Sequence, residues 1–157
     1  MNTIYLQGKI VDIEFSHESN DKQYDKALIE IDDNVHIPIK FRGDMLEVHK
    51  IAENDIVATQ GTLRTYSKSI YVHTNLAPVE IGEGQNCLCT LQGKVVKCDN
   101  RYHSYIIQCY KDTYIPIKSD KEYEVDSIIN VVGYLIERQY TKRGKSDKFI
   151  TYEVVEL

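Results

Sequence analysis

The feature that most constrains the fold is an internal duplication. Residues 6–11 read Leu-Gln-Gly-Lys-Ile-Val and residues 91–96 read Leu-Gln-Gly-Lys-Val-Val, while Ile-Pro-Ile-Lys stands at residues 37–40 and again at 115–118. Shorter matches follow in the same order: 61–63 with 133–135, 66–68 with 140–142, and 79–81 with 155–157. The offset changes from 85 residues to between 72 and 78, as loop-length changes within a duplicated unit would produce. The sequence therefore predicts one small domain present twice, rather than a solenoid of more and shorter repeats.

We place the first domain at residues 1–82 and the second at residues 87–157, with residues 83–86 as the linker. A domain of roughly 75 residues is near the small end for independent folding. Each copy is therefore expected to pack against a neighbour, which is either the other copy or a second chain. The linker is short and polar, so the two copies are expected to be adjacent.

Both copies are predicted to be all-β, with one short helix in the first. An apolar strand at residues 4–10 contains Gly8, which indicates a bend. Residues 16–25 are polar and are predicted to form a long loop. The remaining elements of the first copy are strands 27–32 and 35–41, a helix at 43–54, and strands 56–64 and 70–79. Those of the second are strands 104–110 and 113–118, a turn at 119–126 in place of the helix, and strands 128–138 and 148–155.

Five strands, a helix between the third and fourth, and a glycine bend in the first are typical of the OB fold. The fold class predicted is thus two tandem five-stranded OB-fold barrels, with another small β-barrel or sandwich as the alternative. No apolar run approaches the roughly 20 residues of a membrane helix. The N-terminal residues lack the basic and apolar regions of a signal peptide, so a cytoplasmic protein with reduced thiols is expected.

No catalytic or metal-binding set is recognisable. Cys87 and Cys89 are separated by one residue, which is too close for a zinc knuckle, so the four cysteines are interpreted as small hydrophobic residues. The five histidines lie in unrelated segments, and no phosphate-binding glycine loop occurs. We therefore expect a protein that is not an enzyme and that has no cofactor, no metal and no small-molecule substrate.

Residues 3–80 resemble the bacterial single-stranded DNA-binding protein family. The resemblance rests on the glycine-containing strand Ile4–Lys9, the strand that runs into a helix at 39–48, and the segment 54–61 followed by Leu63-Arg64-Thr65. It implies binding of single-stranded DNA with little sequence preference, in replication, recombination or repair. The family assembles four OB units from four chains, so two units per chain imply a homodimer. The chain has no Trp and no acidic tail after Leu157, which departs from the family.

Binding of a single strand requires a basic groove and flat aromatic faces. In the first copy, His36, Lys40 and Arg42 alternate with an apolar face, and Arg64, Tyr66 and Lys68 lie on the last hairpin before Tyr71. Phe41 matches the position where the family's strand meets its helix; core packing is the alternative. For Tyr66 the alternative is an exposed loop tyrosine, and for Arg64 and Lys68 a solvated turn.

In the second copy, basic residues are concentrated in one hairpin loop. The candidates there are Arg138, Tyr140, Lys142, Arg143, Lys145, Lys148 and Phe149, with the strand residues Tyr105 and Tyr114 as weaker ones. The alternative is that this loop is basic for solubility alone. The formal charge is −5; residues 1–86 hold 8 Lys and Arg against 14 Asp and Glu, a balance of −6. That acidic half favours a rival function, a tandem OB-fold protein-interaction adaptor without nucleic-acid binding.

Overall fold

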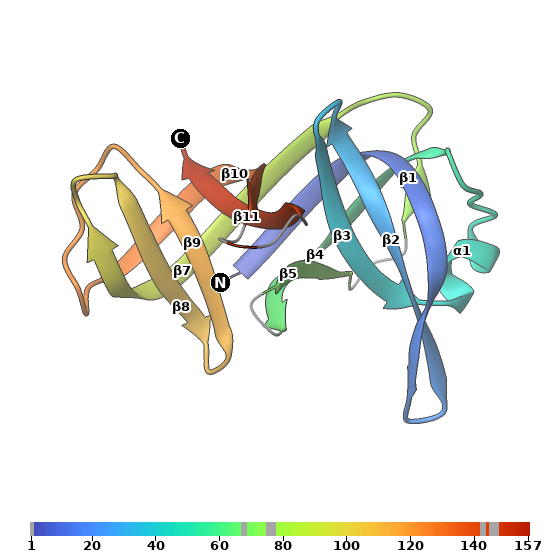
Figure 1. The fold of residues 1–157 in the computed structure, drawn as a ribbon. Coiled ribbons are helices and arrows are strands. Elements are labelled where there is room, and N and C mark those ends of the chain that lie inside the picture. The colour runs from blue at the N-terminus through green and yellow to red at the C-terminus, as the bar shows by residue number, and fades with distance from the viewer. Residues whose placement is uncertain (1, 67–68, 75–77, 142–143, 145–147) are drawn as a thin grey trace. The chain divides into compact units, whose positions relative to one another are not determined.

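The computed structural model describes residues 2–66, 69–74, 78–141, 144 and 148–157 (Figure 1). In this part of the chain eleven strands and one short helix occur. The first half contains β1 (Asn2–Ser19), β2 (Lys22–Asp32), β3 (Val35–Arg42), α1 (Asp44–Val48), β4 (Ile56–Tyr66), β5 (Ser69–Thr74) and β6 (Val79–Glu80). The second half contains β7 (Asn86–Asp99), β8 (Ser104–Tyr110), β9 (Thr113–Lys118), β10 (Ile128–Thr141) and β11 (Lys148–Glu156). No helix in the described ranges is long and apolar enough to cross a membrane.

The chain forms two compact units. The N-terminal unit comprises Thr3–Arg64 and Tyr71–Leu88, and the C-terminal unit comprises Met1–Asn2, Thr65–Ile70 and Cys89–Leu157. The units differ from the proposed sequence copies at residues 1–2 and 65–70, which group with the C-terminal unit, and at residues 87–88, which group with the N-terminal unit.

The strands of each copy are paired in the same closed order. In the first, β1 pairs with β2, β2 with β3, β3 with β5, and β5 with β4, which returns to β1. In the second, the equivalent order is β7, β8, β9, β11, β10 and back to β7. In each ring the pairing of the third strand with the fifth is parallel. This connectivity and the closure of the sheet are those of an OB-fold barrel, which confirms the predicted all-β OB-fold class and fits the predicted pair of barrels.

Each barrel has an apolar interior built by strand alternation. Along β3, Ile37, Ile39 and Phe41 are at most 1% exposed, while the residues between them face outward. The same pattern places Ile115 and Ile117 of β9 inside the second barrel. Side chains two residues apart share a face of a strand, so a period of two in the sequence fixes which face is buried.

A pair of glycines confirms the duplication at the structural level. A Cβ atom on Gly61 would lie 2.3 Å from the carbonyl oxygen of His73, and one on Gly133 would lie 2.1 Å from that of Val155. Both distances are shorter than a real Cβ contact, so only glycine permits the strands to approach this closely. His73 and Val155 are therefore equivalent positions.

The register of the strands corrects one sequence match. Val72 pairs with Ile39 in β3, and Val154 pairs with Ile117 in β9. Since residues 39 and 117 are copies of each other, Val72 and not a residue near Val79 is the counterpart of Val154. The match between 79–81 and 155–157 is thus a coincidence of composition.

Two predicted elements differ from the structure. The predicted loop at residues 16–25 is wrong: β1 and β2 continue as a paired arm, with His17 opposite Tyr24 (Figure 1). Its polar sequence is compatible with strands because the arm is solvated on both faces, while the backbone groups pair with each other. The predicted helix at 43–54 is shortened to Asp44–Val48, and the chain then has positive φ at Lys50 (55°) and Asn54 (76°).

Candidate nucleic-acid interface

The outer face of β2, β3 and β5 carries the polar and aromatic side chains of the N-terminal barrel. Alternation sends Lys26 and Leu28 of β2, Pro38 and Lys40 of β3, and Tyr71 of β5 to this face. The parallel register of Lys40 with His73 and the antiparallel register of Lys26 with Lys40 bring the three strands together side by side. The sequence prediction that His36, Lys40 and Arg42 face away from the core is confirmed.

These side chains line a groove of about 290 Å³. The ammonium group of Lys40 lies 4.5 Å from the centroid of the Tyr71 ring, which is a cation–π contact. Leu28 and Pro38 supply apolar lining. A ring, an adjacent cation and an apolar floor are the groups that a stacked base and its phosphate require.

The groove also contains carboxylates. Asp12 and Glu14 are among its lining residues, and Glu14 forms an ion pair with Lys26 at 3.2 Å. Both partners of this pair are about half exposed or more, so the pair contributes little to stability and can exchange with an incoming phosphate.

A row of three rings extends from the groove onto the β1–β2 arm. His17 and Tyr24 are stacked with centroids 5.0 Å apart and planes 8° apart. The Tyr24 ring lies 6.4 Å from that of His73. Sequence reasoning missed His17 and Tyr24 because the arm was interpreted as a loop, where they have no defined neighbours. It also did not single out His73, which lies on β5. The signal that was present is a ring in each strand of a hairpin, at positions that oppose each other.

The other predicted basic residues of this unit already have acidic or aromatic neighbours. His36 lies 3.3 Å from Glu30 and Arg42 lies 3.1 Å from Asp44. Arg64 is exposed on β4 and acts electrostatically on His73. Partial burial, followed by the charges of Arg64 and Lys40, lowers the pKa of His73 below its usual value.

The prediction of a stacking role for Phe41 is wrong. Its side chain is fully buried in the barrel interior, between strands whose inner faces are aliphatic. A ring without exposed surface cannot stack on a base, so the alternative interpretation, core packing, holds.

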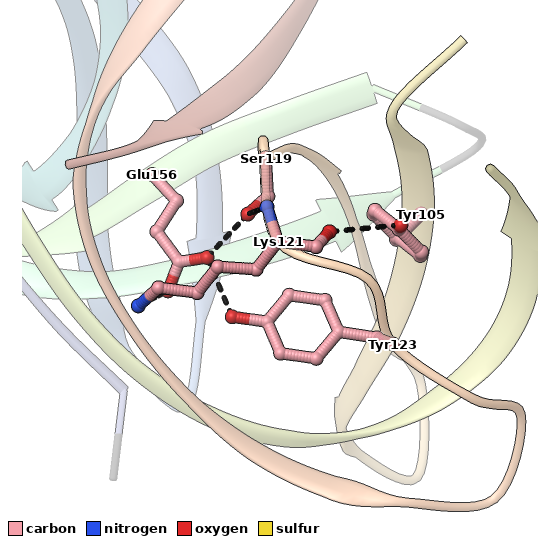
Figure 2. Close-up of polar contacts among 5 residues, drawn as sticks. All are labelled: Tyr105, Ser119, Lys121, Tyr123 and Glu156. Carbon is pink, nitrogen blue, oxygen red and sulfur yellow. Dashed lines mark hydrogen bonds and ion pairs between the residues drawn. The ribbon is translucent and has the colours of Figure 1, made fainter. Parts of the chain in front are cut away.

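The prediction for Tyr105 is also wrong. Tyr105 is 1% exposed, and its hydroxyl lies 2.6 Å from Asn100 Oδ1. The same hydroxyl lies 2.9 Å from the carbonyl oxygen of Lys121, so it donates to one of these two acceptors (Figure 2). Beside it, the carboxylate of Glu156, whose side chain is 3% exposed, accepts hydrogen bonds from Ser119 and Tyr123 at 2.5 Å each (Figure 2). These contacts fix the segment that replaces the helix in the second copy to β8 and β11.

The outer face of the C-terminal barrel differs from that of the N-terminal barrel at the position of the groove tyrosine. The counterpart of Tyr71 is Glu153, one residue before Val154, and Glu153 forms an ion pair with Arg138 at 2.5 Å. Arg138 thus has an acidic partner on the adjacent strand, diagonal to it in the register, and its binding role stays a prediction. The same face of the C-terminal barrel has an apolar hollow, in which Ile106 and Pro116 hold the positions of Leu28 and Pro38. Tyr66 and Tyr114 also line this hollow.

Four predicted basic residues, one in the first copy and three in the basic hairpin of the second, are not placed by the structure. Lys68, Lys142, Arg143 and Lys145 lie outside the described residues. Tyr140, Lys148 and Phe149 are described only by their strand positions, in which Tyr140 opposes Phe149 and Thr141 opposes Lys148. Their binding role stays a prediction.

Comparison with proteins of known structure identifies the fold. No family model and no curated protein matches the sequence. Among solved structures, a deletion mutant of the single-stranded DNA binding protein from Thermus aquaticus matches with a TM-score of 0.73 and 12% identity, over 100% of this chain and 92% of that one. The wild-type protein from Thermus aquaticus matches with a TM-score of 0.72 and 13% identity, over 100% and 90% of the two chains. The chain thus shares, along its whole length, the OB fold of a single-stranded DNA binding protein.

Proposed function

We propose that this protein binds single-stranded DNA with little sequence preference, by stacking bases on exposed rings and pairing phosphates with lysine and arginine. The observation that carries the proposal is the contact of Lys40 with Tyr71 inside the N-terminal groove. It supplies a cation and an open ring face within one nucleotide's reach, on the outer face of an OB barrel. The overall likeness to a protein that binds single-stranded DNA supports the same conclusion.

The two barrels would contribute differently. The N-terminal barrel, which we place at residues 1–82, would provide the groove and the ring row. The C-terminal barrel, at residues 87–157, would contribute its basic hairpin. Within the proposed role in replication, recombination or repair, the protein would protect an unpaired strand, without chemistry of its own.

We further propose that the protein acts as a homodimer, since two OB units per chain then give the four that the resembled family assembles. Sedimentation is expected to give about twice the chain mass of 18.2 kDa. A monomer at micromolar concentration would refute this part of the proposal.

The carboxylates in the groove favour one rival, a protein-interaction adaptor. Asp12 and Glu14 repel phosphate, and they would suit a basic peptide instead. The two functions differ in the sign of the charge that they prefer in a ligand, so one titration separates them.

The test is fluorescence anisotropy with a labelled oligo-dT of about 20 nucleotides at two salt concentrations. Binding is expected to weaken steeply with salt, because each neutralised phosphate releases counterions. Absence of binding at low salt would refute the DNA proposal and leave the adaptor.

A matched pair of tyrosine variants locates the site. Loss of a stacking ring in Tyr71→Ala is expected to cost about 1–3 kcal/mol of binding free energy, which is about 5- to 150-fold in affinity. Tyr110→Ala removes a ring that is 57% exposed but lies outside the groove, so its affinity is expected to match the wild type. Equal losses in the two variants would exclude the groove as the site.

A further inference from the structure

His73 occupies an unusual position for a histidine at a surface that would receive phosphates. It lies on β5, directly after Val72 and two residues beyond Tyr71, so its ring shares the outer face with the groove. His73 is half-buried, and the centroid of its ring lies 6.4 Å from the centroid of the Tyr24 ring. His73 therefore belongs to the same surface as the groove, although it is not one of the residues that line the groove.

The groups that surround this ring come from four strands. Tyr24 faces it from β2, with His17 of β1 stacked behind Tyr24. Lys40 stands beside it in the parallel register of β3, and Arg64 acts on it from β4. Arg42, opposite Tyr24 in the register, is already paired with Asp44.

The electrostatic consequence follows from these neighbours. The two charged residues that shift the pKa of His73 are both cations, and burial acts in the same direction. All three effects favour the neutral imidazole when no ligand is bound. A phosphate that approaches Lys40 and Arg64 would offset their positive charge and add a negative charge near His73. It would therefore favour the protonated imidazole over the neutral one.

We infer that His73 is a proton-linked phosphate contact, which is neutral in the unliganded protein and takes up a proton as single-stranded DNA binds. The inference rests on the proposed function and adds to it that affinity increases as the pH falls. Linkage makes the two effects reciprocal: if DNA favours the protonated ring, then protonation favours DNA by the same factor.

The size of the effect follows from the change in pKa. A rise of one pH unit in the pKa of His73 on binding corresponds to a tenfold increase in affinity at a pH below both values. At a pH above both pKa values the ring is neutral in both states and contributes nothing of this kind. Between pH 8 and pH 5.5 we therefore expect an increase of about three- to tenfold.

The experiment measures the affinity for oligo-dT from pH 5.5 to pH 8.5 at constant ionic strength, for the wild type, His73→Gln and His49→Gln. Glutamine keeps a polar side chain of similar size but does not titrate, and His49 is exposed at the end of α1, away from the groove. The wild type and His49→Gln are expected to gain affinity on acidification, and His73→Gln is expected to show a flat profile. In parallel, nuclear magnetic resonance of the His73 ring in the wild type is expected to show a higher pKa in the complex.

Two results would overturn the inference. One is a His73→Gln variant whose affinity rises on acidification as much as that of the wild type. The other is a His73 pKa that stays the same or falls when DNA binds, a measurement that needs no variant. A wild type that binds DNA with no pH dependence would refute the inference and leave the proposed function, whereas no binding at any pH would refute both.

Discussion

The buried carboxylate of Glu156 offers the sharpest test of how the C-terminal barrel is held together. The side chain is 3% exposed and accepts a hydrogen bond from Ser119 Oγ and another from the Tyr123 hydroxyl, each at 2.5 Å. Lys121 Nζ lies 3.4 Å from the second oxygen, but this lysine is 64% exposed. The perturbation is Glu156→Ala, which removes the acceptor from both hydroxyl groups.

The expected magnitude follows from these contacts. A hydrogen bond to a charged group contributes about 1.5–3 kcal/mol, and two are lost. The exposed lysine adds at most about 1 kcal/mol. Removing a buried charge recovers part of its desolvation cost. We therefore expect Glu156→Ala to lower the free energy of unfolding by about 2–4 kcal/mol.

The same contacts predict an effect at high pH. Burial, followed by the hydrogen bond to Glu156, raises the pKa of Tyr123 to about 12 from the usual 10. Because the folded state holds this proton more tightly than the unfolded chain, its contribution to stability is complete below pH 10 and is lost as the pH rises toward 12.

The assay is urea denaturation followed by circular dichroism at one protein concentration, since an oligomer's stability depends on concentration. Glu122→Gln changes an exposed carboxylate in the same segment and is expected to stay within about 0.5 kcal/mol of the wild type. A double-mutant cycle of Tyr123→Phe with Glu156→Gln isolates the pair. A loss below about 0.5 kcal/mol for Glu156→Ala would refute the reasoning.

Three further predictions follow. Gly133→Ala would place a Cβ atom 2.1 Å from the carbonyl oxygen of Val155, so it is expected to lower the free energy of unfolding in urea by about 1–3 kcal/mol or more; a neutral variant would contradict the strand approach. Because the pKa of His73 is lowered in the folded state, stability is expected to fall as the pH drops below 6.5, and less so in His73→Gln; parallel urea midpoints from pH 7.5 to 5.5 would count against it. Glutamate at all three of Lys142, Arg143 and Lys145 is expected to weaken oligo-dT binding in the anisotropy titration without changing the thermal midpoint, and unchanged affinity would remove this hairpin from the site.

The strands of the barrels were predictable because their signal is local. The hairpin with strands at 104–110 and 113–118 matches β8 and β9 in the structure. The alternation of apolar residues in the Ile-Pro-Ile-Lys segments fixes which side chains face inward, and both copies have the same alternation. Turn residues and a period of two act over a few positions, so no knowledge of distant neighbours is needed.

The candidate site was only partly predictable. Lys40 and Tyr71 were identified, but the sequence could not show that the ammonium group of one lies over the ring of the other. His17 and Tyr24 were missed, since a solvated arm has no apolar pattern to reveal its pairing. For Phe41 the sequence left stacking and core packing open, and the structure buries its ring on the same inner face as Ile39.

The sequence alone determined the duplication, the closed β architecture of each copy and the identity of the buried faces. Repeats and periodicity are relations between sequence positions, so they can be recognised without coordinates. The tertiary structure decided which copy places a lysine over a tyrosine ring. Tyr71 and Glu153 hold equivalent positions on their last strands, and their different surroundings come from partners far away in the sequence: Lys40 for the tyrosine and Arg138 for the glutamate. Such pairings depend on the register between strands, which forms only when the barrel closes.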